Sequence, residues 1–355
     1  MGDPVQAQND LQNAWQHQIR KELKLEADTA LAREIEPGIF LDPSLTEKQV
    51  PEVLSINWPE HPWLTGMQIT VADPFEANVQ LKLALQHGVQ SLWMVLHQKM
   101  ELPDFQRLFA GIQLELITMF IEPAEEAHAV DTWRELDQFL SLQDELPASG
   151  GFFFPGDGDG GWQTLDWQDL LQRYPGWYWI KMEPTWNYNF VDRLTSILEQ
   201  VNRMTTSRPS HAGSIDDWLS RFLVVWPGDN RILAHLAATR ALHLLWQQLF
   251  HSRTPPLTVL GCIGEENFTA DANINLIRSA AMATTLALSG IHSMYITPAE
   301  AESNFYRRLS VNIQQLLQLE SHLAPKADLI AGSYVLDDLT SQFVAAAWRQ
   351  WQRVL

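Results

Sequence analysis

The sequence predicts an α/β protein that folds as a TIM-type (β/α)8 barrel, and three observations support this prediction. Short apolar runs alternate with longer segments of helical period through eight rounds between residues 66 and 323. The runs are nearly continuous in apolar residues, as strands buried on both faces should be. Eight rounds in roughly 260 residues match the usual size of such a barrel. A doubly wound sheet is the competing fold, but its usual glycine-rich first turn, G-x-G-x-x-G, is missing.

The predicted strands are eight apolar runs, which cover residues 66–72, 91–97, 114–121, 150–155, 177–183, 221–227, 256–263 and 291–297. The longer segments have the apolar spacing of helices that pack on one face. These predicted helices cover residues 75–88, 103–111, 124–142, 163–173, 188–203, 230–251, 271–289 and 304–323.

Residues 271–298 illustrate one round of the predicted barrel. Asp271 or Asn273 can cap the N-terminus of the helix by accepting hydrogen bonds from its free N–H groups. Gly290 is suited to the left-handed residue that ends the helix. The strand that follows stops at Thr297, which places this residue where barrel enzymes keep their catalytic groups.

Residues 1–60 are predicted to form an N-terminal arm, and residues 61–355 the barrel with a C-terminal helix. An apolar stripe runs along a helix in the arm and consists of Leu11, Trp15, Ile19 and Leu23. The Pro-rich segment "PGIFLDPSLTEKQVPEV" that follows is extended and has no core of its own. The arm must therefore lie on another surface, either its own barrel or a partner, and the sequence favours neither.

The charge and composition argue against several classes of partner. The chain has 355 residues and a formal net charge of −19, with no basic run. Nucleic acids and anionic membrane surfaces are bound by clustered Lys and Arg, so neither partner is expected. No stretch approaches the roughly 20 apolar residues of a membrane helix, and the N-terminus lacks the features of a secretory signal. The single cysteine, Cys262, fits a reducing compartment. A cytoplasmic protein is expected, with a processed organellar protein as the alternative.

The C-terminal ends of the predicted strands are acidic and almost free of Arg and Lys. They carry Asp73, His97, Glu122, Asp157, Glu183, Asp229, Glu265 and Glu266. A phosphate-bearing or acyl-CoA substrate would find few cations there to pair with. Glu183, Asp229 and Glu265 end successive strands, and hard cations such as Mg²⁺ prefer oxygen ligands. They define an alternative function, a metal-dependent barrel enzyme, but we favour the interpretation that they are solvated loop residues.

Other candidate sites are interpreted as structural. The stretch "PGDGDGG" at 155–161 lacks the glutamate that a calcium loop needs twelve positions from Asp157. Cys262 lies in an apolar strand, where a thiol is usually a small core residue. His97 and His292 have no second ligand at metal spacing. No catalytic, cofactor-binding or metal-binding residue is therefore assigned.

Three ordered motifs stand in the second half of the chain. The stretch "NFTADANINLIRSAAMATTLALSGIHSMYITP" follows the pattern T-x-x-D-P-x-x-N-x-x-R and keeps Asp271, Asn275 and Arg278. The stretch "VNIQQLLQLESHL" is similar to R-N-x-Q-x-x-L-x-x-E-S. The stretch "DLIAGSYVLDDLT" is similar to D-P-A-G-G-S-Y-Y-x-E-x-L-T and keeps Asp328, Gly332, Ser333 and Tyr334. At these mutual distances the motifs resemble the cobalamin-dependent acyl-CoA mutases of the methylmalonyl-CoA mutase family. That resemblance implies a TIM-type barrel, and we interpret the seven residues as structural.

The groups that this family uses for catalysis are changed in the chain. Near the first strand, "GMQITVADPFEAN" lacks the Arg and Tyr of R-Q-Y-A-G-F. After the fifth strand, "MEPTWNYNF" lacks the His of G-Y-H, and "LGCIGEEN" replaces H-x-Q-T-S-G. The motif D-x-H-x-x-G, whose His ligates cobalt in the family, does not occur before the chain ends at Leu355.

The resemblance is greatest to the family's small (β) subunits, whose opening is similar to "WQHQIRKELK" and "EPGIFLDPSLTEKQV". It implies a non-catalytic barrel without a cofactor of its own, in a heterodimer with a catalytic large subunit that holds adenosylcobalamin. The complex would interconvert methylmalonyl-CoA and succinyl-CoA. The alternatives are the metal-dependent enzyme above and a homo-oligomeric pseudoenzyme with a scaffold role.

Overall fold

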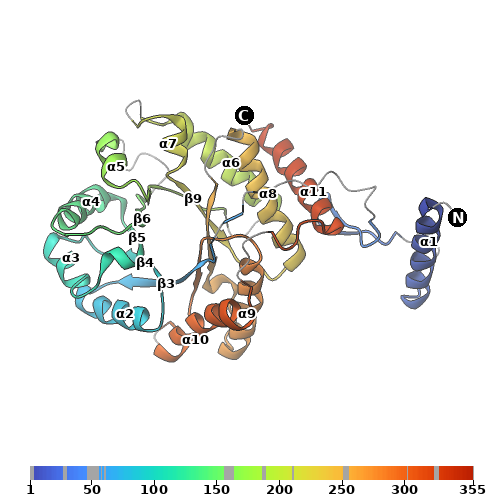
Figure 1. The fold of residues 1–355 in the computed structure, drawn as a ribbon, viewed down its shortest axis with the longest axis horizontal. Helices are drawn as coiled ribbons and strands as arrows, with labels where there is room; N and C mark the ends of the chain where they lie inside the picture. Colours follow the sequence, from blue (N-terminus) through green and yellow to red (C-terminus); the bar gives the residue numbers. More distant parts are fainter. Residues whose placement is uncertain are drawn as a thin grey trace.

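The computed structural model describes residues 4–26, 30–45, 56, 58–59, 61–155, 164–185, 189–209, 212–250, 256–301, 303–323 and 328–354, with side chains from residue 11 onward. A ring of strands stands at the centre with helices around it (Figure 1). The strands of the ring are β3 (Leu64–Val71), β4 (Ser91–Leu96), β5 (Thr118–Pro123), β6 (Ser149–Phe152), β7 (Trp177–Tyr178), β8 (Ile180–Met182), β9 (Phe222–Pro227), β10 (Thr258–Ile263) and β11 (Ser293–Ile296). This arrangement confirms the predicted TIM-type barrel.

One extended segment, broken into two short strands, closes the ring. Neighbouring strands pair in parallel in the order β7-β6-β5-β4-β3-β11-β10-β9-β8. Strands β7 and β8 follow one another along the chain and are interrupted at Trp179. Because β7 pairs with β6 and β8 pairs with β9, the segment joins the two ends of this order. All eight predicted runs therefore supply strands to the barrel.

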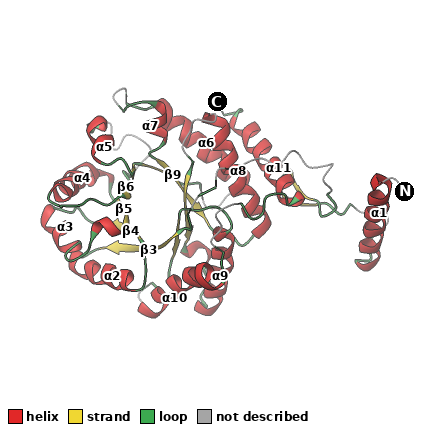
Figure 2. Ribbon diagram, in the orientation of Figure 1, coloured by secondary structure: helices red, strands yellow, loops and turns green. Residues whose placement is uncertain are grey.

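The helices cover the outside of the ring (Figure 2). The predicted ones are α2 (Pro74–Gln86), α3 (Leu102–Leu108), α4 (Glu126–Ser141), α5 (Trp167–Arg173), α6 (Phe190–Thr206), α8 (Ile232–Phe250), α9 (Ala272–Ala287), α10 (Asn304–Gln315) and the C-terminal α11 (Tyr334–Trp351). Helix α11 packs against α6 and α8. The short helix α7 (Ile215–Leu219) was not predicted, although Ser214 and Asp217 form a capping box at its start.

Several predicted boundaries are wrong, and in two of these cases a different kind of helix replaces part of the predicted element. The run 114–121 begins with a 3-10 turn, and β5 starts only at Thr118, because Thr118 pairs with Ser91 at the start of β4. The helix 304–323 passes into a π-helical turn at Leu316–Glu320. Residues 156–163, which include Asp157 and most of the stretch 155–161, lie outside the described residues.

The second half of the predicted arm packs on the barrel. Its two strands form an antiparallel hairpin, β1 (Arg33–Glu36) and β2 (Ile39–Leu41). Ile39 is fully buried. The carboxylate of Glu36 accepts hydrogen bonds from the backbone N–H of Phe190 at 2.9 and 3.1 Å and pairs with Arg231 at 2.6 Å. The hairpin is therefore anchored to the start of α6 and to the residue before α8.

Helix α1 (Pro4–Glu22), by contrast, stands away from the ring (Figure 1). Among its described side chains, Gln12 donates a hydrogen bond to the carbonyl of Ser44 at 2.7 Å. Leu11 is 72% exposed and Trp15 is 40% exposed. The predicted apolar stripe is thus left uncovered by the barrel. Of the described helices, none is both long and apolar enough to cross a membrane.

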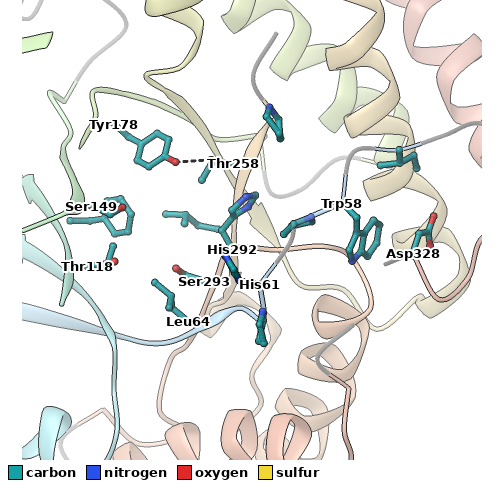
Figure 3. A pocket seen from close by; sticks show the side chains of 16 residues that line it. Trp58, His61, Leu64, Thr118, Ser149, Tyr178, Thr258, His292, Ser293 and Asp328 are labelled. Atoms are coloured by element: carbon teal, nitrogen blue, oxygen red, sulfur yellow. Dashed lines mark hydrogen bonds between the residues drawn. The ribbon is translucent and has the colours of Figure 1, made fainter. Parts of the chain in front are cut away.

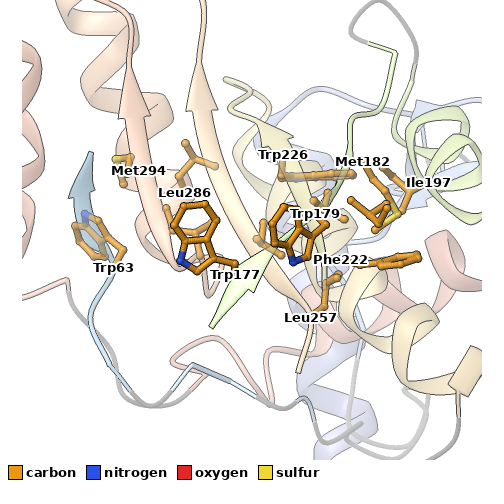
Figure 4. Close-up of a cluster of buried hydrophobic side chains, with 14 of the residues drawn as sticks. Trp63, Trp177, Trp179, Met182, Ile197, Phe222, Trp226, Leu257, Leu286 and Met294 are labelled. Carbon is orange, nitrogen blue, oxygen red and sulfur yellow. The ribbon is translucent and has the colours of Figure 1, made fainter. Parts of the chain in front are cut away.

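Apolar side chains fill two layers. The larger layer lies between the strands and the helices and is rich in tryptophan, with Trp177, Trp179 and Trp226 fully buried (Figure 4). The smaller layer lies inside the ring and consists of Trp93, Phe120, Phe153, Leu223, Val225, Leu260 and Tyr295. We call this second cluster the inner plug. It fills the middle of the barrel axis.

Two histidines of α8 are buried among apolar side chains, and we expect them to make the stability depend on pH. Burial lowers the pKa of His235 to about 4 and that of His243 to about 3. In the unfolded chain a histidine has a pKa of about 6.5. Between these pKa values the unfolded state binds more protons than the folded state. The contribution of the two neutral histidines to the free energy of unfolding is therefore complete above about pH 6.5 and is lost as the pH falls.

Urea denaturation at several values between pH 7 and 5 measures this dependence. In the variant His243→Leu, the slope of the free energy of unfolding against pH should be smaller by up to about 1.4 kcal/mol per pH unit, which is the contribution of one histidine. His128→Leu is the matched control, because His128 is exposed, and its slope should equal that of the wild type. Equal slopes in all three proteins would show that His243 is not held neutral by burial.

Candidate functional site

Lys181 on β8 is the central side chain at the C-terminal mouth of the barrel. Its ammonium pairs with Glu122 at 2.5 Å and with Glu183 at 3.1 Å. It also lies over the rings of Trp93 and Phe153, at 5.4 and 5.9 Å from their centroids. Trp93 Nε1 in turn donates a hydrogen bond to Glu122 at 3.0 Å. One lysine is therefore held between two carboxylates on top of the inner plug.

The protonation of this cluster limits its chemistry. Burial alone would lower the pKa of Lys181, but the charges of Glu122 and Glu183 outweigh it and the pKa is raised. Lys181 is therefore a fixed cation and not a base or a nucleophile at neutral pH. The nearby thiol of Cys262 has a pKa well above its usual value, because burial and then the charge of Glu183 disfavour the thiolate. A neutral thiol of this kind is a poor nucleophile, although Cys262 is only half-buried.

A cavity of about 320 Å³ stands at this mouth and is bounded by Gln68, Glu122, Lys181, Glu183, Cys262, Glu266 and Thr297, together with apolar and glycine residues. Thr297 thus lies at the mouth, as its position after the last strand predicted. No histidine is among the described lining residues. The carboxylates outnumber the lysine, so an anionic ligand would meet unfavourable charge.

The three carboxylates of the alternative metal hypothesis are not brought together. Glu183 pairs with Lys181. Asp229 pairs with Arg231 at 2.8 Å and with Arg193 at 3.4 Å. Glu265 lines a separate hollow beside Asp73. Within the described ranges, no group of three or more His, Cys, Asp or Glu side chains is placed to hold a metal ion.

The prediction that the rim is almost free of cations is wrong. Lys181, Arg193 and Arg231 all reach carboxylates there. Although burial opposes the charge of Asp229, the hydrogen bonds from Arg231 outweigh it and hold the pKa of that carboxyl below its usual range. The lysine was missed because it lies inside the strand "WYWIKME", two residues before the last glutamate, where alternation turns it inward.

The other predicted rim residues serve different purposes. Asp73 caps α2 by accepting a hydrogen bond from the backbone N–H of Glu76 at 2.9 Å. His97 is exposed after β4. His292 lies at the opposite, N-terminal end of the barrel, where its Nδ1 accepts a hydrogen bond from the backbone N–H of Val259 at 3.1 Å. These side chains do not join the Lys181 cluster.

The first three signature residues contact the loop before α9. Asp271 caps the helix by accepting hydrogen bonds from the backbone N–H groups of Asn273 and Ile274. The side chain of Asn275 bonds Thr269, accepting at 2.7 Å from its N–H and donating at 2.8 Å to its carbonyl. Arg278 donates to the carbonyl of Asn267 at 2.9 Å. Gly290, after the helix, has the predicted left-handed conformation, with φ of +68°.

The last four signature residues surround the turn into α11. Asp328 forms an ion pair with Arg240 of α8, which also bonds Asp337 at 2.7 Å. Gly332 has φ of +82° and donates its N–H to the same Asp337 at 3.1 Å. The carbonyl of Ser333 accepts a hydrogen bond from the N–H of Asp337 at 2.8 Å. The side chain of Tyr334 is 42% exposed. Arg240 was not predicted as a structural residue. Its signal in the sequence is a single cation within the apolar helical segment "ATRALHLLW".

The closed parallel ring, with its inner plug and its internally paired C-terminal mouth, defines a TIM-type barrel protein. Residues 208–355 match the family model described as methylmalonyl-CoA mutase. The second half of the chain is therefore similar to the methylmalonyl-CoA mutase family, which confirms the resemblance seen in the three motifs.

Two relatives show the extent of this similarity. Methylmalonyl-CoA mutase of Cereibacter sphaeroides is 25% identical over 171 residues, which are 45% of this chain and 24% of that protein. The methylmalonyl-CoA mutase small subunit of Porphyromonas gingivalis is 28% identical over 134 residues, 34% of this chain and 22% of that protein. The matched part therefore spans about a quarter of the length of these relatives. The solved dihydropteroate synthase of Yersinia pestis is similar at a TM-score of 0.42 and 9% identity, over 72% of this chain and 93% of that one.

Proposed function

We propose that this chain is a non-catalytic barrel of the small-subunit type, which assembles in the cytoplasm with the catalytic large subunit of a methylmalonyl-CoA mutase. The observation that carries the proposal is the C-terminal mouth. Lys181, whose ammonium lies over the rings of Trp93 and Phe153, is bound to Glu122 and Glu183 of the same chain. In a barrel enzyme this mouth holds the catalytic groups. Here the lysine is held by carboxylates of the same chain instead of facing a substrate.

The residues at this mouth do not fit adenosylcobalamin or an acyl-CoA thioester. The described lining of the cavity of about 320 Å³ has no histidine that would ligate a metal in the cofactor. Its carboxylates, including Glu122, Glu183 and Glu266, face a ligand whose phosphate groups are anionic. The chemistry of the complex would therefore belong to the large subunit, and this chain would supply a folded surface to it.

Helix α1 is the surface that we assign to this partner. The side chain of Leu11 is largely exposed and that of Trp15 partly exposed, and α1 stands away from the ring (Figure 1). Exposed apolar side chains on one helix face gain stability when a groove of another protein covers them. The hairpin at residues 33–41, which packs on the barrel itself, would hold the base of this helix in place.

The isolated chain should bind no adenosylcobalamin and show no mutase activity, because its described mouth lacks the groups that both need. Equilibrium dialysis at micromolar cofactor measures the first property, and conversion of methylmalonyl-CoA to succinyl-CoA the second. Adding the large subunit from the same organism should produce a complex that co-elutes in size-exclusion chromatography and is active. The large subunit alone is the control. Stoichiometric cofactor binding or turnover by the isolated chain would contradict the proposal.

A further inference from the structure

A second, larger cavity opens at the N-terminal end of the barrel strands, and the proposed function makes no use of it. Its volume is about 740 Å³. Residues at or near the starts of the strands surround it, among them Leu64, Thr118, Ser149 and Ser293 (Figure 3). Pockets that hold small molecules usually measure about 300–1,000 Å³. The size is therefore that of a ligand site, although barrel enzymes act at the opposite end.

The wall combines apolar surface with hydroxyl groups from five strands. The hydroxyls belong to Thr118, Ser149, Tyr178, Thr258 and Ser293. Tyr178 and Thr258 share a hydrogen bond of 2.9 Å, which is drawn in Figure 3. Leu64, Phe120 and Leu260 supply apolar surface. A few polar groups on a mainly apolar wall are what fixes the orientation of a small molecule.

The charges at this cavity disfavour an anion. Its described lining contains no Lys and no Arg. Burial lowers the pKa of His292 to about 4, so this imidazole is neutral at pH 7. The lining carboxylate, Asp328, is already paired with Arg240. His61 is exposed at the rim. A ligand with a carboxylate or phosphate would lose hydration there, and the described part of the lining offers it no buried counter-charge.

We propose that this cavity is a binding site for a neutral, mainly apolar small molecule that carries one or two hydrogen-bonding groups. The inner plug separates the site from the C-terminal mouth. Phe120 and Leu260 line the cavity and belong to the plug, whose other side meets Lys181 through the rings of Trp93 and Phe153. A molecule bound here does not reach the Lys181 cluster. The proposal therefore holds whether or not the chain assembles with a large subunit.

A pair of fluorescent probes tests both the site and its preference for neutral ligands. N-phenyl-1-naphthylamine is neutral and has one N–H group, and 8-anilinonaphthalene-1-sulfonate has the same rings with an added sulfonate. The full chain should bind the neutral probe saturably, at one molecule per chain, with enhanced blue-shifted emission. It should bind the sulfonate at least roughly tenfold more weakly, which corresponds to about 1.4 kcal/mol.

Variants that fill the cavity locate the binding. Ser149 is half-buried and lines the cavity, so the ring of Ser149→Phe should occupy it and weaken binding of the neutral probe at least tenfold. Leu64→Trp, from a different strand, is the second filling variant in case the first fails to fold. Ser141→Phe adds the same ring at the exposed end of α4 and should bind like the wild type. Circular dichroism and thermal melting confirm folding of each variant.

Several results would overturn the proposal. One is the absence of saturable binding of the neutral probe to the folded chain. Another is equal or tighter binding of the sulfonate, which would show that the site prefers anions. The third is unchanged affinity in a folded filling variant, because the probe would then bind elsewhere.

Discussion

Replacing Arg240 by alanine should lower the free energy of unfolding by about 3–5 kcal/mol, because the change leaves two carboxylates without their buried partner. The Arg240 side chain is 1% exposed. It bonds Asp337 at 2.7 Å and pairs with Asp328, so it ties α8 to the first turn of α11 and to the start of the segment that leads into it. Asp337 also accepts the N–H of Gly332. Loss of Arg240 therefore loosens the turn as well as the contact between the two helices.

Urea denaturation followed by circular dichroism measures this effect. Arg349→Ala is the matched control, because Arg349 lies on the exposed side of α11, and the change should cost less than about 0.5 kcal/mol. Arg240→Met keeps most of the volume and removes the charge, so it should be nearly as harmful as the alanine variant. If Arg240→Met is as stable as the wild type, packing and not charge pairing holds the two helices together.

Removing residues 1–26 should weaken association with the large subunit by several orders of magnitude and leave the stability of the barrel unchanged. The deletion removes α1, whose stripe is Leu11, Trp15, Ile19 and Leu23. Covering each of these side chains contributes roughly 1.5–3 kcal/mol before the cost of ordering the helix. The barrel should keep its stability because α1 stands away from the ring (Figure 1), and its Gln12 side chain bonds the carbonyl of Ser44, which belongs to the arm and not to the barrel.

Isothermal titration calorimetry with the large subunit measures the affinity, and thermal melting measures the stability. The point variant Trp15→Glu should reproduce much of the loss, whereas Asn13→Glu, at an exposed position of the same helix, should not. Removing residues 1–45 instead takes away the buried Ile39 and Glu36, and this longer deletion should destabilise the barrel itself. Unchanged affinity after removal of residues 1–26 would place the interface elsewhere.

Much of the fold could be predicted because its signals are local. A strand buried on both faces requires a continuous apolar run, as in 222–227. Such runs occur at all eight strand positions of the barrel. The capping of α9 by Asp271 follows from the free N–H groups of one helix turn. The short helix α7 had a similar local signal in Ser214 and Asp217. The break of the fifth predicted strand into β7 and β8, by contrast, depends on pairing with two different neighbours, because β7 pairs with β6 and β8 pairs with β9.

The sequence by itself determined the barrel, its helices, the family signature and the acidic character of the strand ends. Only the tertiary structure decided how the charges pair, because the partners lie far apart along the chain. Lys181 meets Glu122 across 59 residues, Arg240 meets Asp337 across 97, and Arg231 meets Glu36 across 195. Ion pairs between distant residues follow no fixed spacing that can be recognised in a sequence. Their partners meet only because the barrel closes and the hairpin at residues 33–41 packs on it. The same reason explains why the arm divides into a hairpin bound to its own barrel and a helix whose apolar stripe is left open.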